Sequence, residues 1–506
     1  MTNLRALISG SDVRGRALGE GAVLTDSVAK RLGQAFAAFL KKKGSEKPLV
    51  YIGRDSRLSG EALMDAFTQG LCSGGAHVVK VGLCTTPAMY MALITPLWGG
   101  DGSVMVTASH LPPERNGFKF FLPDGGIGLD VLDEILTLAE SGGDLTAPGG
   151  SAEEKAFLPA YQELLKKRIL EGLGTSEEKP LQGLHIAVDA GNGAGGFYAS
   201  FLESLGANTY GSRYLDPDGR FPNHIPNPEN AAAMASISEA VKESGADMGV
   251  IFDTDCDRAA IVDADGKEIN RNRLIALVSA VLLNDRSGIT VVTDSVTSSG
   301  LKQFIAERGG VQYRFKRGYH NVIEEARRLN EEGIDCPLAM ETSGHAALRE
   351  NHFLDDGMYL VTVLICEAMR MKRKGKSLFG LIDDLKEPLE SAEVRLKITA
   401  EDFRAVGRQA IDTVIQAANQ APDWSLAPDN REGVRINQTL DGKEESAWFL
   451  LRLSVHDPVL PLNLESDKAG GNLIMAKALY TALKDIENLD LEPLQNFIRQ
   501  EEQKHE

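Results

Sequence analysis

Short apolar runs alternate with amphipathic segments along most of the chain. Near the N-terminus, strand-like runs at residues 4–9, 48–53 and 77–82 are separated by segments with helical spacing near 24–42 and 60–74. Further strand-like runs lie at 184–189, 248–252, 289–295, 311–316 and 337–343. Strands that alternate with helices indicate α/β layers. The pattern therefore predicts a series of α/β units.

Three or four domains are expected, because 506 residues are too many for a single core. The Gly/Ser/Ala-rich stretch 141–154 is typical of a linker. The last unit begins with EVRLKI near residue 391, contains VRIN and AWFLLRLSV, and ends in a helical tail at about 470–505. The predicted domains are 1–154, 155–264, 265–388 and 389–506.

Charge and composition narrow the class of partner. The formal net charge of −18 argues against nucleic acid and against an anionic membrane surface as partners. No apolar run approaches the roughly 20 residues of a membrane span, and the N-terminus lacks the apolar core of a secretory signal. The five cysteines are scattered without CxxC spacing, which indicates a reducing compartment. A cytoplasmic protein is predicted.

Residues 104–121, VMVTASHLPPERNGFKFF, carry the strongest functional pattern. The apolar run VMV delivers Ser109 to the C-terminal end of a strand, and His110 follows directly. Pro112 and Pro113 prevent a helix after the serine, and Asn116-Gly117 predicts a tight turn. Lys119 then returns on a second apolar run. A fixed hydroxyl beside a histidine and an ammonium is suited to carrying a phosphoryl group.

Three aspartates alternate in MGVIFDTDCDR, residues 248–258. In an extended chain, Asp253, Asp255 and Asp257 would share one side, and such carboxylates repel unless a cation lies among them. Oxygen ligands of this kind suit Mg²⁺. An EF-hand is excluded, because its sixth and twelfth positions would fall on Arg258 and Ala264 rather than on Gly and Glu. Between these carboxylates the thiol of Cys256 is expected to have a raised pKa and low reactivity.

A glycine pattern at 191–196 satisfies G-x-G-x-x-G after a strand. A dinucleotide fold would require a second strand ending in an acid about 20 residues later. The chain instead continues with the proline-rich loop YLDPDGRFPNHIPNPEN, so a nicotinamide cofactor is rejected. Both segments are expected to be structural.

The loop TASHLPPERNGFKFF resembles the active-site loop of the α-D-phosphohexomutases, the phosphomannomutase/phosphoglucomutase superfamily. DTDCDR resembles the family's DGDGDR loop, with Thr254 and Cys256 in place of the glycines, and METSGH at 340–345 resembles its GEMSGH loop. SGSDVRG, GRDSRLSG and KRGYH also match family segments. The resemblance implies four domains around a central cleft: three similar α/β domains and a smaller C-terminal α+β domain.

The resemblance also implies roles for individual residues. Catalysis would rest on Ser109, which carries the phosphoryl group, with Arg14, Lys119 and His110. The metal, Mg²⁺, would be held by Ser109, Asp253, Asp255 and Asp257. Substrate would be bound by Arg258, Lys316, Tyr319, His320, Glu341, Ser343, His345, Arg452, Ser454 and His456. Either Tyr319 or His320 would reach the ligand, whereas Arg54 and Asp55 are interpreted as scaffold contacts.

The C-terminal phosphate loop departs from the family pattern R-x-S-G-T-E-P. Here it reads RLSVHDP, so Arg452 and Ser454 are kept while Val455, His456 and Asp457 replace the next three residues. Arginine with a hydroxyl still suits phosphate, and a protonated His456 would add charge. Val455 does not adopt positive φ cheaply, so a different loop shape is expected.

The expected function is interconversion of hexose 1-phosphate and hexose 6-phosphate, with mannose or glucose as the sugar. A phosphoserine and a hexose 1,6-bisphosphate intermediate or activator would take part. Alternatives are a phosphoglucosamine or phosphopentose mutase, or a non-catalytic sugar-phosphate-binding homologue. Small sugar phosphates are the expected partners of a monomer or homodimer.

Overall fold

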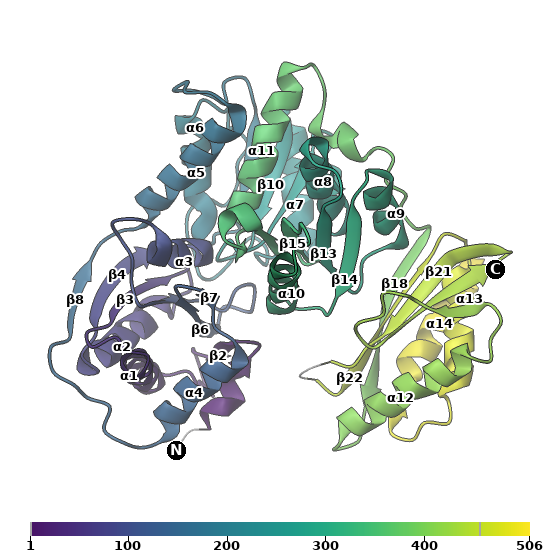
Figure 1. Cartoon of the computed structure of the whole chain (residues 1–506), viewed down its shortest axis with the longest axis horizontal. Helices are drawn as coiled ribbons and strands as arrows, with labels where there is room; N and C mark the ends of the chain where they lie inside the picture. Colours follow the sequence, from purple (N-terminus) through teal and green to yellow (C-terminus); the bar gives the residue numbers. More distant parts are fainter. Residues whose placement is uncertain (1–2, 455–456, 506) are drawn as a thin grey trace. The chain divides into compact units, whose positions relative to one another are not determined.

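The computed structural model describes residues 3–454 and 457–505, which form two compact units (Figure 1). The first unit contains residues 1–274 and 343–380, and the second contains residues 275–342 and 381–506.

The N-terminal sheet of the first unit carries the loop that ends in Ser109. Its strands are ordered β1-β2-β6-β5-β3-β4-β8, with β7 paired to β6. Parallel pairing joins β5, β3, β4 and β8, whereas β6 runs antiparallel to β5. The strands are β1 (Ile8–Ser9), β2 (Asp12–Arg16), β3 (Leu49–Arg54), β4 (His77–Leu83), β5 (Gly102–Val106), β6 (Arg115–Leu122), β7 (Gly125–Gly126) and β8 (Ser151–Glu154).

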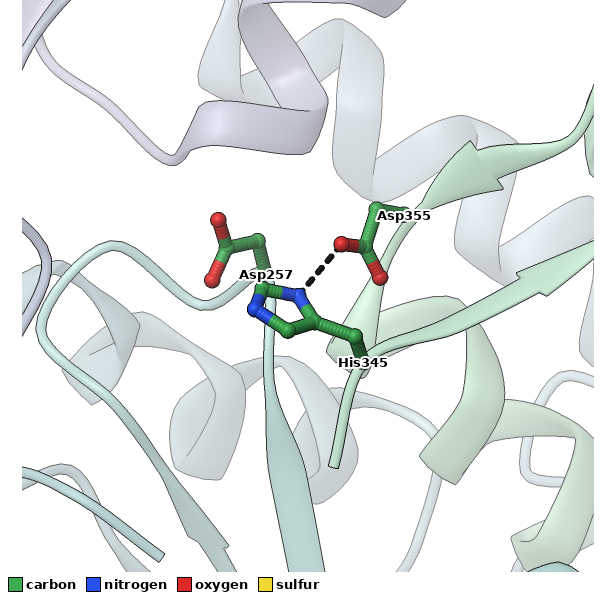
Figure 2. Close-up of side chains that lie close together, drawn as sticks. All are labelled: Asp257, His345 and Asp355. Carbon is green, nitrogen blue, oxygen red and sulfur yellow. Dashed lines mark ion pairs between the residues drawn. The ribbon is translucent and has the colours of Figure 1, made fainter. Parts of the chain in front are cut away.

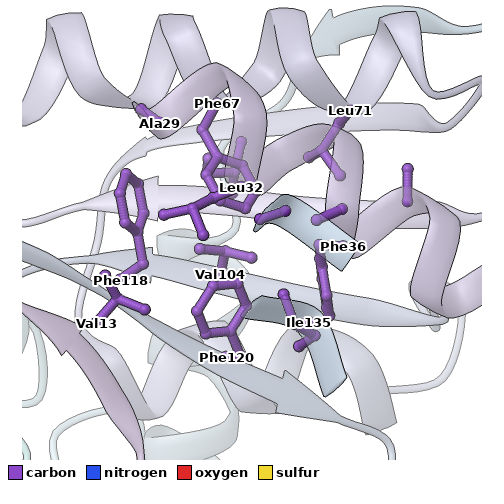
Figure 3. Close-up of a cluster of buried hydrophobic side chains, with 14 of the residues drawn as sticks. Val13, Ala29, Leu32, Phe36, Phe67, Leu71, Val104, Phe118, Phe120 and Ile135 are labelled. Carbon is purple, nitrogen blue, oxygen red and sulfur yellow. The ribbon is translucent and has the colours of Figure 1, made fainter. Parts of the chain in front are cut away.

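A continuous apolar core lies between this sheet and its helices (Figure 3). Phe36 from α1 (Asp26–Lys42) packs edge-on against Phe120 from β6, with ring centroids 5.2 Å apart. The backbones of α1 and α2 (Gly60–Ser73) approach closely, because a Cβ at Gly70 would lie 2.0 Å from the Lys30 carbonyl oxygen. The remaining helices of this region are η1 (Leu4–Leu7), α3 (Thr86–Ile94) and α4 (Leu129–Glu140).

The second sheet of the first unit carries the acidic loop. Its order is β12-β11-β10-β9, in which β9 and β10 are parallel and the other pairs antiparallel. The strands are β9 (Ile186–Asp189), β10 (Met248–Phe252), β11 (Ala259–Asp263) and β12 (Glu268–Ile269). In addition, β16 (Ala346–Leu348) pairs antiparallel with β17 (Leu354–Asp355). The helices are α5 (Leu158–Leu173), η2 (Ala194–Gly196), α6 (Phe197–Ser204), α7 (Ala231–Ser244), η3 (Arg349–Asn351) and α11 (Gly357–Arg373).

The second unit joins a parallel sheet to an antiparallel one. In the parallel part, β13 (Thr290–Asp294) lies between β14 (Val311–Phe315) and β15 (Leu338–Met340). Its helices are α8 (Asn272–Asp285), which begins in the first unit, α9 (Ser299–Glu307) and α10 (Tyr319–Glu331), followed by η4 (Leu378–Ile382).

The C-terminal sheet is antiparallel throughout, in the order β19-β20-β21-β22-β18-β23. Its strands are β18 (Glu390–Ile398), β19 (Trp424–Leu426), β20 (Val434–Leu440), β21 (Lys443–Leu451), β22 (Val459–Ser466) and β23 (Leu489–Asp490). The helices α12 (Phe403–Ala418), α13 (Gly471–Leu483) and α14 (Glu492–His505) share an apolar core with this sheet.

The predicted fold class, α/β domains followed by a C-terminal α+β domain, is confirmed. The domain boundaries at 154, 264 and 388 stay predictions. Within the described residues, no helix combines the length and apolarity that a membrane crossing requires.

Several local predictions are wrong. Residues 4–7 form a 3-10 helix instead of a strand, and residues 151–154 of the expected linker form the edge strand β8. The expected continuous C-terminal helix is interrupted at β23. Asn116-Gly117 lies within β6, because the two prolines already reverse the chain before residue 115. At β8 and β23 the pairing with the distant strands β4 and β18 decided what local composition left open.

Candidate functional site

Ser109 lies in the loop between β5 and β6, and Lys119 returns beside it on β6, with Met105 paired to Lys119. The Ser109 backbone has φ of +50°. This left-handed conformation is uncommon for a residue with a Cβ. The Ser109 N–H donates to the Thr107 hydroxyl over 2.9 Å, and the serine is buried.

The three aspartates of the acidic loop converge at the C-terminal end of β10. Ligand oxygens of Asp253, Asp255 and Asp257 lie within 4.8 Å of one another, and all three residues are buried. The prediction of convergence is correct, but the expected extended geometry is wrong. The loop turns, with Cys256 at φ of +65°, since the chain must reverse at once into antiparallel β11.

Two cations from different elements offset the three carboxylates. The Lys119 ammonium lies 2.5 Å from Asp257 and 3.8 Å from Asp255. The Arg258 guanidinium lies 3.0 Å from Asp253. Burial, followed by the charges of Asp257 and Asp255, raises the pKa of Asp253 well above its usual range. The mutual repulsion of these buried carboxylates is therefore only partly relieved by the two cations.

The hydroxyl of Ser109 joins the two predicted motifs. Its Oγ donates to Asp253 Oδ2 over 2.8 Å and accepts from Arg258 Nη2 over 2.9 Å. Residues more than a hundred positions apart thus place one hydroxyl between a carboxylate and a guanidinium. Such an arrangement can hold the oxygen for phosphoryl transfer.

His110 lies beside the same guanidinium. Arg258 Nη2 is 2.5 Å from His110 Nδ1, which is also 3.3 Å from Ser109 Oγ. Burial first, and then the charges of Arg258 and Arg14, lower the pKa of His110 to about 3. The imidazole is therefore neutral at physiological pH and accepts from Arg258.

The acidic loop fits a hard divalent cation. Among the described residues, Asp255 Oδ1 and Asp257 Oδ1 are buried side-chain oxygens that have no hydrogen-bond partner. Buried polar atoms without partners are uncommon in native structures. Oxygens that converge in this way, with Ser109 Oγ beside them, match the preference of Mg²⁺ for oxygen ligands.

His345 is brought to the acidic loop by an isolated antiparallel bridge between Arg258 and His345. Its Nδ1 forms an ion pair with Asp355 at the end of β17, and the other side of the ring faces Asp257 (Figure 2). Against the opposing effect of burial, the charges of Asp355 and Asp257 raise the pKa of His345 to about 9. The imidazole is thus protonated at neutral pH. Ser343, two residues earlier, is also buried.

Arg14 is carried by β2, in register with Gly117 of β6. Its guanidinium is held by the Asp12 carboxylate through contacts of 2.7 and 3.2 Å. The side chain is largely buried. A Cβ at Gly117 would lie 2.9 Å from Arg14 Cγ and 2.7 Å from the Thr107 carbonyl oxygen, so Arg14 lies near the start of the Ser109 loop. Its charge contributes to the lowered pKa of His110.

The remaining predicted residues belong to the second unit. Glu341 is buried at the end of β15, and its Oε1 accepts from the Gly318 N–H over 2.6 Å. Lys316 and His320 are exposed, and Tyr319 begins α10. Glu341 thus fixes the loop that carries Lys316, Tyr319 and His320.

Arg452 and Ser454 follow β21. The Ser454 hydroxyl accepts from the Asp457 N–H over 3.2 Å. Burial lowers the pKa of Arg452, and the like charge of Arg317 acts in the same direction. Val455 and His456 lie outside the described residues, so their predicted effects stay predictions.

Sequence reasoning missed residues that support the predicted ones. Asp355 pairs with His345, Asp12 pairs with Arg14, and Thr86 donates to Asp255 Oδ2 over 2.5 Å. Arg317, within the KRGYH segment, was also missed. Its effect on the pKa of Arg452 arises only in the tertiary structure. Its position in the KRGYH motif would have been enough to name it as a candidate.

Comparisons with known proteins agree with this geometry. Residues 5–144, 159–266 and 270–388 match the family models described as alpha/beta/alpha domains I, II and III of phosphoglucomutase/phosphomannomutase. A phosphoglucomutase of Neisseria gonorrhoeae is 31% identical over 468 residues, which cover 92% of this chain and 93% of the relative. A phosphomannomutase/phosphoglucomutase of Pseudomonas putida is 31% identical over 460 residues, with 90% of each chain covered.

A solved structure agrees as well. It is that of a phosphoglucomutase/phosphomannomutase family protein from Burkholderia thailandensis, with a TM-score of 0.78 and 26% identity over 96% of this chain and 98% of that one. The chain belongs to the phosphoglucomutase/phosphomannomutase family.

Proposed function

We propose that this protein is a phosphohexomutase that interconverts hexose 1-phosphate and hexose 6-phosphate, with mannose or glucose as the sugar. The observation that carries the proposal is the position of Ser109 Oγ between Asp253 and Arg258. The relatives from Neisseria and Pseudomonas bear names of this activity, which favours it over the other mutases and over a non-catalytic homologue.

The metal is assigned as Mg²⁺, held by Asp253, Asp255, Asp257 and an oxygen on Ser109. When bound, it supplies positive charge that polarises the phosphoserine. Asp255 Oδ1 and Asp257 Oδ1, which have no hydrogen-bond partner among the described residues, support this assignment.

Phosphoryl transfer is proposed to use the groups around Ser109 in turn. The phosphoryl group leaves Ser109 Oγ for a sugar hydroxyl, which gives a bisphosphorylated sugar and a free serine. The phosphoryl group that the sugar carried from the start, at its other position, is then transferred to Ser109 Oγ, which restores the phosphoserine and releases the isomeric sugar phosphate. Lys119, Arg258 and Arg14 offset the charge that spreads over the phosphoryl oxygens.

The two histidines are assigned different roles because their surroundings shift their pKa values in opposite directions. A pKa of about 3 makes His110 a weak base, so we assign it to orienting Arg258. A pKa of about 9 leaves a proton on His345, which makes it the better donor to an oxygen of the substrate.

The substrate residues of the second unit are assigned by their chemistry. Glu341 suits paired sugar hydroxyls, and one of Tyr319 and His320 adds a further contact. Lys316, Arg317, Arg452 and Ser454 suit a phosphate, and His456 is assigned with them. A hexose 1,6-bisphosphate is the proposed activator. We further propose a cytoplasmic monomer or homodimer, in keeping with five free cysteines.

Replacement of the proposed nucleophile tests the function. Ser109→Ala should abolish turnover of mannose 1-phosphate and glucose 1-phosphate while leaving the melting temperature near that of the native protein. Intact-mass measurement should find a phosphate on the native protein and none on the variant. Ser200→Ala, at an exposed site on α6, is the matched control. Normal turnover by Ser109→Ala would falsify the phosphoserine assignment.

A further inference from the structure

The loop after Ser109 needs an external restraint. Its own backbone supplies two hydrogen bonds, from Leu111 N–H to Ala108 and from Arg115 N–H to Pro112. Pro112 and Pro113 have no N–H to donate. Ser109 itself is held at φ of +50°, which costs roughly 1 kcal/mol for a residue with a Cβ. Such a conformation persists only where neighbouring groups over-determine it.

Arg57 supplies that restraint from the turn before α2. One of its terminal nitrogens donates to the carbonyl oxygens of Ser109 and Leu111, the latter over 2.5 Å. The other donates to Pro112 and Arg115 over 2.8 and 2.9 Å. A single guanidinium therefore binds carbonyls along the whole loop from 109 to 115. Its side chain is fully buried.

Asp55 fixes this guanidinium and the serine together. Its carboxylate lies 3.3 Å from Arg57 Nε and accepts from the Arg57 N–H over 2.9 Å. Asp55 also accepts from the Thr107 hydroxyl over 2.7 Å, and that hydroxyl accepts from the Ser109 N–H. Both the N–H and the C=O of Ser109 are thus tied to one buried ion pair.

The proline-rich loop between α6 and α7 covers the pair from outside. The Phe221 ring lies over the Arg57 guanidinium, 5.3 Å from its centre. Gly219 lies close to the Arg57 backbone, since a Cβ there would lie 2.7 Å from Arg57 Cα. This loop, which has no evident role in the reaction, thereby shields the guanidinium from water. Hydrogen bonds are stronger in such a water-excluded environment.

We propose that Arg57, held by Asp55 and covered by Phe221, is a positioning residue that sets Ser109 Oγ for phosphoryl transfer. It acts through the loop backbone and touches neither substrate nor metal. The inference rests on the proposed mutase function of Ser109. A displacement of about 1 Å in a reacting atom lowers turnover on the order of 100-fold. Release of this loop should therefore affect the chemical step more than binding.

Two substitutions of Arg57 separate positioning from general stability. Arg57→Met removes every donor, whereas Arg57→Lys keeps the charge but lacks the planar fork. We expect kcat to fall on the order of 100-fold in both while KM changes by less than about threefold. Amide exchange should accelerate in residues 107–115 and stay unchanged in α1. Arg54→Met is the matched control, because Arg54 is partly exposed and bonds the Asp55 carbonyl next to it.

The measured kcat and amide exchange rates show whether Arg57 positions the Ser109 loop. Unchanged kcat in Arg57→Lys and Arg57→Met overturns the proposal, and so does a fall in kcat without faster local exchange. If neither variant folds, Phe221→Leu leaves Arg57 in place and is expected to lower kcat and to speed exchange at 107–115. Native values for both would overturn the proposal. If the native protein itself carries no phosphate and turns over no hexose phosphate, the proposed function fails instead.

Discussion

Asp255→Asn should weaken Mg²⁺ binding and reduce the stabilisation and activation that Mg²⁺ gives the protein. Three buried carboxylates face two cations, Lys119 and Arg258, and Asp255 Oδ1 lacks a hydrogen-bond partner among the described residues. The substitution removes one charged ligand and keeps the shape of the side chain. An acceptor oxygen remains for the Thr86 hydroxyl, which lies 2.5 Å from Asp255 Oδ2.

The magnitude follows from linkage between binding and folding. At a free Mg²⁺ concentration of about 100 times Kd, a ligand that binds only the folded state stabilises it by about 2.7 kcal/mol. Loss of a direct ligand should weaken affinity by at least the roughly 100-fold that changes around a metal site reach. At the same concentration the stabilisation then falls to about 0.4 kcal/mol. With about 2 °C per kcal/mol for a unit of this size, the Mg²⁺-induced rise in melting temperature shrinks by about 5 °C.

The assay compares each protein with its own metal-free baseline. Melting temperature and turnover of glucose 1-phosphate are measured across an Mg²⁺ titration for the native protein and for Asp255→Asn. Asp265→Asn, in the exposed turn between β11 and β12, is the control for the change in net charge. Equal Mg²⁺-induced shifts and equal activation midpoints in Asp255→Asn and the native protein would refute the metal assignment.

Two further predictions concern titrating groups. The pKa of His345 is raised from 6.5 to about 9, so its ion pair with Asp355 stabilises the fold fully below pH 6.5 and loses this effect as pH rises to about 9. The gap in melting temperature between the native protein and Asp355→Asn should therefore shrink between about pH 6 and pH 10, and a constant gap would contradict the ion pair. Burial, then the neighbouring aspartates, raise the pKa of Cys256 well above its usual range, so iodoacetamide should label it only after unfolding. Peptide mass spectrometry that finds Cys256 labelled as fast as partly exposed Cys72 would count against this.

Local pattern predicted the elements that end in functional residues. The apolar run before Ser109 and the returning run with Lys119 became β5 and β6, and the run before Asp253 became β10. These strands are strongly apolar and short, so local preference and burial agree. The pattern failed at residues 151–154, where pairing with β4 made the chain a strand. It also failed at residues 4–7, which form a 3-10 helix whose leucines pack into the apolar core.

The sequence by itself determined which chemical groups the site contains: a serine and three aspartates that follow predicted strands, and the cations near them. Only the tertiary structure decided how they meet. It placed Ser109 Oγ 2.8 Å from Asp253, gave His110 and His345 opposite protonation states, and put Arg57 behind the serine loop. The physical reason is that distances, burial and electrostatic shifts arise between residues far apart in the chain, and these depend on packing that no local pattern contains.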